Sequence, residues 1–105
     1  MQSFLYRNEK LIQEFKYPIR CMLDLENKYI IVLEIPTGVQ INDNVYCINK
    51  DGRLLWQIEQ RYYEGESPSY HNVWITSEGL FAYRPNYEYK IDIATGKILS
   101  VDFLK

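Results

Sequence analysis

The chain has 105 residues, of which 47% are hydrophobic and 25% charged, and its formal net charge is −2. This composition argues against a disordered chain, and the near-neutral charge argues against a nucleic-acid binder, which normally carries a basic surface. No apolar run approaches the roughly 20 residues that span a membrane, and no export signal opens the chain, so we expect one cytoplasmic domain over residues 1–105.

Residues 4–17 are the first expected element. Aromatic residues make up 15% of the chain, including ten tyrosines, and such side chains suit the half-buried surface of a sheet. We therefore interpret residues 4–17 as a hairpin that turns at residues 7–10. A short helix is the alternative, because a helical period is partly matched by Phe4, Leu5, Leu11, Ile12 and Phe15.

Eight further strands follow in four hairpins, because apolar and polar residues alternate between turns that are rich in Gly, Pro, Asn and Asp. The expected strands are 19–25, 29–35, 45–49, 53–59, 72–76, 80–84, 87–93 and 97–103. The sequence thus predicts an all-β fold: a single-domain antiparallel β-meander of about eight strands, with a curled sheet and propeller-blade-like hairpins.

One phrase occurs twice in the chain. Residues 48–56 read "INKDGRLLW" and residues 90–99 read "KIDIATGKIL", each a strand, a polar turn with glycine, a basic residue and a second strand. We expect Gly52 and Gly96 to adopt positive φ angles, which glycine alone tolerates easily. The phrase is therefore interpreted as a repeated hairpin.

The period of two along each strand also predicts which side chains form the core. The expected core residues are Leu23, Ile31, Leu33, Val45, Leu54, Trp56, Ile58, Val73, Ile75, Phe81, Ile91, Ile93, Leu99 and Val101.

The stretch "VWITSEGLFAY…YKIDIATGKILS" resembles a blade of the PQQ-type β-propeller repeats. Matching positions are Gly79, Tyr83, Asp92, Thr95, Gly96 and Lys97, and residues 45–56 resemble the end of a preceding blade. A closed propeller needs at least about four blades, and this chain supplies roughly two. The resemblance therefore implies local blade geometry, and it transfers no cofactor-binding residue.

Residues for catalysis are sparse. His71 is the only histidine, and Cys21 and Cys47 lie in apolar segments without metal-ligand spacing, which favours two buried reduced thiols. A Cys–His pair would require His71 to meet one of these cysteines in space. We expect no metal site, no cofactor and no enzymatic activity.

Residues 59–78 are the candidate recognition segment. The segment carries four glutamates, Glu59, Glu64, Glu66 and Glu78, against a single arginine, and it is rich in aromatic residues. Tyrosine-rich acidic loops on a rigid sheet suit the recognition of a basic protein. The predicted partner-binding residues are Tyr62, Tyr63, Glu64, Glu66, Tyr70 and Trp74. The alternative is a solvated loop whose tyrosines only cover the end of the sheet.

Two functional hypotheses remain. By type, the chain resembles the small bacterial immunity proteins of toxin–immunity pairs, which implies a protein-binding module that neutralises a basic toxin. The alternative is a structural β-protein, a propeller-like fragment that associates with its own copies or with a partner subunit. Either hypothesis leaves the protein as a monomer or as a homodimer joined through an edge strand.

Overall fold

The computed structural model describes residues 3–7, 10–60 and 68–104, and within these ranges the chain forms strands and no helix. The strands are β1 (Phe4–Arg7), β2 (Lys10–Glu14), β3 (Ile19–Asp24), β4 (Lys28–Leu33), β5 (Val45–Asn49), β6 (Leu54–Gln57), β7 (Asn72–Thr76), β8 (Gly79–Arg84), β9 (Tyr87–Ile91) and β10 (Ile98–Phe103). The all-β prediction is confirmed, and residues 4–17 contain a hairpin instead of the alternative helix. Nothing in the described ranges is a helix that could cross a membrane.

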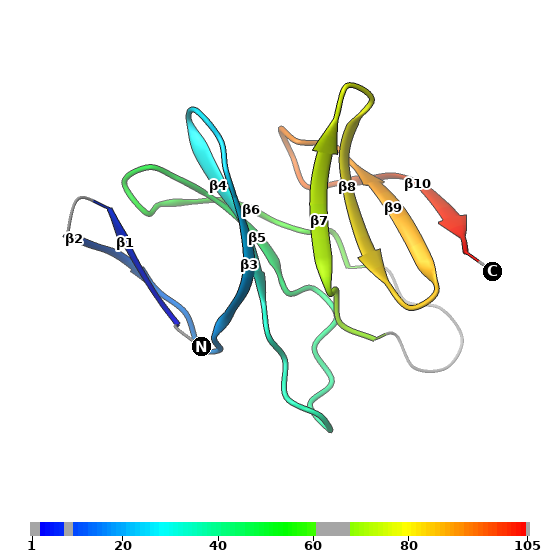
Figure 1. The fold of residues 1–105 in the computed structure, drawn as a ribbon, viewed down its shortest axis with the longest axis horizontal. Coiled ribbons are helices and arrows are strands. Elements are labelled where there is room, and N and C mark those ends of the chain that lie inside the picture. The colour runs from blue at the N-terminus through cyan, green and yellow to red at the C-terminus, as the bar shows by residue number, and fades with distance from the viewer. Residues whose placement is uncertain (1–2, 8–9, 61–67, 105) are drawn as a thin grey trace.

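The strands form three antiparallel sheets that succeed one another in chain order (Figure 1). β1 and β2 make the N-terminal hairpin. The first sheet has the order β3-β4-β5-β6, and the second has the order β10-β9-β8-β7. In both four-stranded sheets every strand pairs with its neighbours in sequence, as expected of a meander. The strands are divided among three sheets and do not form a single curled one.

The two copies of the repeated phrase occupy the same place in the two four-stranded sheets. Gly52 lies between β5 and β6, and Gly96 lies between β9 and β10, so each connects the third strand to the fourth. Their φ angles are +93° and +79°, which confirms the prediction. The turns also begin alike, because Asn49 Oδ1 and Asp92 Oδ1 each accept a hydrogen bond from the N–H two residues ahead.

A β-bulge also recurs in the fourth strand of each sheet. In β6, Leu55 is the extra residue, since Leu54 and Trp56 oppose consecutive residues of β5. In β10, Leu99 is the extra residue in the same way. The residues before and after such a bulge are two positions apart, yet they point to opposite faces of the sheet.

The N-terminal hairpin repeats this arrangement. Leu11 and Gln13 of β2 oppose the consecutive residues Tyr6 and Leu5 of β1, which leaves Ile12 as the extra residue. Because the bulge lies in its second strand, the hairpin corresponds to the third and fourth strands of a four-stranded sheet. The chain is therefore one half-unit followed by two full units.

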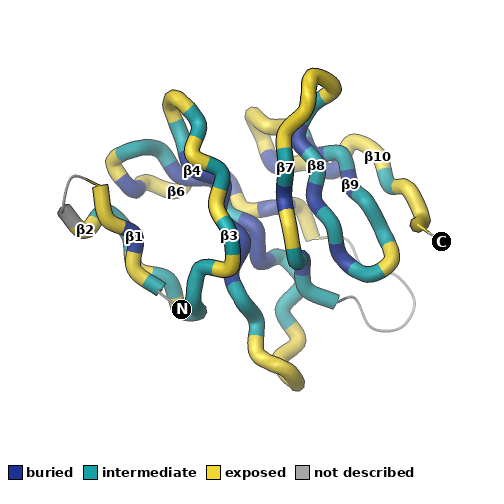
Figure 2. The backbone as a smooth tube through the Cα atoms, in the orientation of Figure 1, coloured by how far each residue is buried: buried dark blue, intermediate teal, exposed yellow. Residues whose placement is uncertain are grey.

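One apolar core fills each junction between successive units, and buried residues line both junctions (Figure 2). The junction between the two sheets buries Ile30, Val32, Val45, Cys47, Trp56, Ile58, Tyr70, Val73, Leu80, Ala82, Tyr89, Ile91 and Ile98. The junction between the hairpin and the first sheet buries Leu5, Tyr29, Ile31, Leu33 and Ile48.

Half of the predicted core residues are buried, and the exposed ones lie at the bulges and sheet ends. Buried as expected are Ile31, Leu33, Val45, Trp56, Ile58, Val73 and Ile91, while Leu23, Phe81 and Val101 are half-buried. The prediction was wrong for Leu54, Ile75, Ile93 and Leu99, which are exposed. Leu54 opposes Ile48 on the face away from Trp56 because of the bulge, and Ile98 takes the core position assigned to Leu99.

Candidate functional site

Four of the six predicted partner-binding residues, Tyr62, Tyr63, Glu64 and Glu66, lie outside the described residues. The other two, Tyr70 and Trp74, are described, and the structure places them on opposite sides of the second sheet: Tyr70 in the core and Trp74 on the outer face. The outer face is here the face of the second sheet directed away from the first sheet.

Tyr70 is a core residue, with 1% of its surface exposed, so the expectation that it is an exposed contact is wrong. The centroids of the Tyr70 and Tyr89 rings are 5.4 Å apart in an edge-to-face arrangement, and the Arg84 guanidinium carbon lies 4.9 Å from the centroid of the Tyr70 ring. Arg84 is equally buried, and its Nε–H donates to Tyr89 Oη at 2.9 Å. Packing in the core therefore explains the presence of Tyr70. The tyrosine-rich composition of the segment did not show that this tyrosine is buried.

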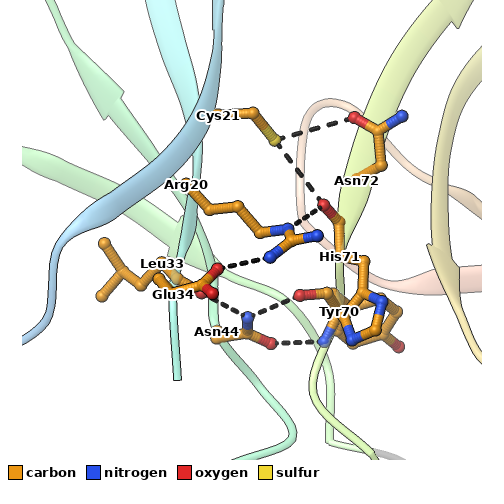
Figure 3. Close-up of polar contacts among 8 residues, drawn as sticks. All are labelled: Arg20, Cys21, Leu33, Glu34, Asn44, Tyr70, His71 and Asn72. Carbon is orange, nitrogen blue, oxygen red and sulfur yellow. Dashed lines mark hydrogen bonds and ion pairs between the residues drawn. The ribbon is translucent and has the colours of Figure 1, made fainter. Parts of the chain in front are cut away.

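Asn44 determines where the backbone of Tyr70 lies (Figure 3). Its buried amide nitrogen donates to the Leu33 and Tyr70 carbonyls at 2.8 and 2.9 Å, and its Oδ1 accepts from Tyr70 N–H at 2.7 Å. A buried amide with these three bonds is well satisfied. Asn44 thus joins the end of β4 to the entry of the second sheet.

At the same junction, Cys21 lies against the main chain of His71. Cys21 Sγ lies 3.7 Å from Asn72 Oδ1 and 4.0 Å from the backbone carbonyl of His71, so the thiol meets the main chain of His71 (Figure 3). That carbonyl also accepts from Arg20 Nε at 2.8 Å. Burial raises the pKa of the Cys21 and Cys47 thiols, which keeps both in the weakly nucleophilic thiol form near neutral pH.

The described residues contain no group of three or more His, Cys, Asp or Glu side chains that could hold a metal ion. They do line two grooves. One, of about 300 Å³, lies between the residues after β2 and the first sheet and is bordered by Phe15, Tyr17, Tyr46 and Leu54. The other, of about 500 Å³, lies at one end of the second sheet and is rimmed by the exposed Ile75, Ile93 and Leu99.

Trp74 belongs to an aromatic cluster on the outer face. Its indole stacks on the ring of Phe81 at 5.9 Å with an interplanar angle of 16°, and the two residues oppose each other in β7 and β8. Beside them, the rings of His71 and Tyr83 form an edge-to-face pair, with their centroids 6.3 Å apart. All four side chains are half-buried, and we call Trp74, Phe81, His71 and Tyr83 the outer aromatic cluster.

Sequence reasoning found Trp74 but missed its neighbours. Phe81 was expected in the core, whereas Leu80, Ala82 and Arg84 are the buried residues of β8. The alternation within residues 79–84 carried the signal, because a strand with Leu80 and Ala82 inward must place Phe81 and Tyr83 outward.

Two carboxylates lie next to this cluster on the outer face. Glu88 of β9 stands directly opposite Asp102 of β10 and beside Tyr83 of β8. Like charges placed opposite each other on a sheet repel. Within the described ranges, neither carboxylate forms an ion pair. Glu59, which was counted as part of the acidic segment, instead accepts a hydrogen bond from Ile98 N–H at the junction.

A family model described as "Domain of unknown function (DUF7957)" matches residues 3–103, and the chain therefore belongs to this family. No curated protein and no solved structure matches the chain. The resemblances to PQQ-type repeats and, by type, to immunity proteins stay predictions.

Proposed function

We propose that this member of the DUF7957 family is a small non-enzymatic protein-binding module of the immunity type, which neutralises a partner toxin in the cytoplasm by occupying its active surface. The observation that carries the proposal is the outer aromatic cluster. Trp74 and Phe81 stack on two paired strands of a sheet whose other face is the core, so their rings are held in place before a partner arrives.

The cluster has the properties of an anchor for a protein partner. Tryptophan and tyrosine dominate the binding free energy of protein interfaces, because they bury a large area at a small entropy cost. The rings of the cluster are half-buried, which leaves part of each available for contact. A rigid strand-borne platform also loses little conformational freedom on binding.

Glu88 and Asp102 outnumber Lys90, which stands opposite Phe81, so the charges beside the cluster favour a basic partner. Glu88 and Asp102 face each other without an ion pair in the described ranges, and a cationic side chain placed between them would remove their repulsion. The predicted contacts Tyr62, Tyr63, Glu64 and Glu66 remain part of the proposal. They lie outside the described residues, and they enter the proposal as a prediction from the sequence alone.

A protection assay tests the proposal. The product of the gene immediately upstream is expressed in cells with and without this protein, and growth is measured. We expect rescue by the natural chain and loss of rescue by Trp74→Ala, with the purified variant still folded. Leu55→Ala, which truncates a 49% exposed side chain in β6, is the matched control and should rescue. Full rescue by Trp74→Ala would remove the outer aromatic cluster from the proposal, and an upstream product that does not harm cells would contradict the immunity role.

A further inference from the structure

The start of β7 is held by side chains of the first sheet. In the order β10-β9-β8-β7, β7 is an edge strand, and among the described strands it pairs with β8 alone. Its other edge lies beside β3, where Arg20 and Cys21 meet His71 and Asn72 (Figure 3). A backbone edge without a neighbouring strand needs other partners for its polar groups. Side chains of β3 supply such partners here.

Arg20 makes the shortest of these contacts. Its Nε–H donates to the His71 carbonyl at 2.8 Å, and its Nη1 forms an ion pair with Glu34. The guanidinium is planar and rigid, so a partner at one nitrogen fixes the direction of the donor at another. Asn44 bonds both backbone groups of the preceding residue, Tyr70. The first sheet therefore holds two consecutive residues at the entry of the second sheet.

His71 is the member of the outer aromatic cluster that depends most on this hold. It precedes β7, whereas Trp74, Phe81 and Tyr83 lie within paired strands. Its N–H is bonded within the second sheet, to the Tyr83 carbonyl, while its own carbonyl is bonded across the junction, to Arg20. The position of its imidazole against the Tyr83 ring is therefore set by both sheets.

We propose that Arg20 is a positioning residue for partner binding: it holds His71, and with it one end of the outer aromatic cluster, in the geometry that the partner meets. The inference rests on the proposed function. The Arg20 and Glu34 side chains are 39% and 32% exposed, so their pairing contributes little to the free energy of unfolding. Its effect is to restrict the ring before a partner arrives, which lowers the entropy cost of binding.

Arg20→Met tests the inference, because it keeps a long side chain and removes every donor. His71 is the only histidine of the chain, so its imidazole is identified in an NMR spectrum without further assignment. In the natural chain we expect nuclear Overhauser contacts between the imidazole and the Tyr83 ring. In Arg20→Met these contacts should weaken at least about twofold, and the His71 N–H should exchange at least about tenfold faster, because the entry of β7 opens locally. The urea midpoint should stay close to that of the natural chain.

The protection assay supplies a second readout. Arg20→Met should reduce growth at a level of the upstream product that the natural chain tolerates. Arg20 is cationic, so charge alone would make its removal favour a basic partner, and a loss of protection therefore reports lost positioning. Arg53→Met removes the same charge from an exposed arginine just before β6. This control should keep the imidazole contacts and the protection of the natural chain.

Unchanged imidazole contacts in Arg20→Met would overturn the inference. Full protection by Arg20→Met would also overturn it if the contacts are weakened, because the position of His71 would then not matter to the partner. A natural chain that gives no protection would instead contradict the proposed function, on which the inference rests.

Discussion

The indole of Trp56 fills the space in which a Cβ atom on Gly96 would lie: Cε3 and Cδ2 of the ring are 2.5 and 2.8 Å from that position. Trp56 belongs to β6 of the first sheet, and Gly96 belongs to the turn before β10 of the second. The repeated glycine turn is therefore both a hairpin connection and the point at which one unit packs against the preceding one.

Gly96→Ala should lower the free energy of unfolding by about 2–4 kcal/mol, because it combines a left-handed φ with overpacking against the indole ring. Gly38→Ala is the matched control. Its φ is +88°, but no atom lies within 4 Å of the added Cβ, so only the backbone cost of about 1 kcal/mol should remain. Urea unfolding of both variants measures the difference, and equal losses would contradict the packing role of Gly96.

Gly52→Ala should detach the N-terminal hairpin. The added Cβ would lie 1.8 Å from the carbonyl oxygen of Ile12, and a backbone atom cannot yield as a flexible side chain does. Displacement of the hairpin would also break the hydrogen bond from Gln13 Nε2 to Gly52 O. Hydrogen exchange should become faster throughout β1 and β2, while β7–β10 keep their protection. Unchanged exchange in the hairpin would show that its docking does not depend on Gly52.

Trp56→Ala should destabilise the protein by about 3–5 kcal/mol, since the side chain is 6% exposed and lies in the core between the sheets. Trp56→Phe keeps a ring but loses the bond from Nε1–H to Ile93 O. Lys28 Nζ also donates to that carbonyl, so the loss should be only about 1–2 kcal/mol. Chemical denaturation ranks the two variants, and an equal or reversed ranking would mean that packing area does not dominate here.

Asn44→Ala should cost about 2–4 kcal/mol, because it leaves two buried carbonyls and one buried N–H without the amide that bonds them. Asn72→Ala removes an exposed asparagine from the same junction and should change stability by less than about 0.5 kcal/mol. Thermal unfolding compares the pair. A similar midpoint for both variants would show that Asn44 does not hold the sheets together.

Alkaline pH should weaken the fold. Burial raises the pKa of the Cys21 and Cys47 thiols above the value of about 8.5 that they have in the unfolded chain. The folded chain then binds more protons than the unfolded chain at high pH, so the free energy of unfolding falls as pH rises above about 8.5. Below that pH the contribution is fully present.

Urea unfolding between pH 7 and 10 should show this fall, and it should be smaller in a Cys21→Ala, Cys47→Ala double variant. Burial and the nearby Asp43 carboxylate also raise the pKa of Tyr46, so part of the fall near about pH 10 should persist without the thiols. An identical pH dependence in both proteins would show that the thiols do not contribute.

Local patterns in the sequence were sufficient for the strands and turns. Asp51-Gly52 and Thr95-Gly96 identified two turns and their backbone conformation, since only glycine adopts a left-handed φ at little cost. The prediction of alternating faces failed at Leu54 and Leu99, because a bulge inserts one residue and so changes which face its neighbours occupy. No residue type in the sequence marks the position of such a bulge.

The candidate site was less predictable than the fold. Tyr70 and Trp74 come from the same aromatic segment, and only the tertiary contacts distinguish them. Asn44, which lies 26 residues before Tyr70, fixes the backbone that places Tyr70 inside. Such a partner cannot be inferred from local sequence, whereas the outward position of Trp74 follows from its alternation with buried Val73.

The chain order of the units has a consequence for synthesis. Because the hairpin, the first sheet and the second sheet lie in space in the order in which they occur in the sequence, each unit finds its packing surface already made as it leaves the ribosome. Every strand pairs with a neighbour in sequence, so no strand waits for a distant one. The first sheet can close over Leu5 before residue 70 is translated, and the second sheet can then close over Trp56.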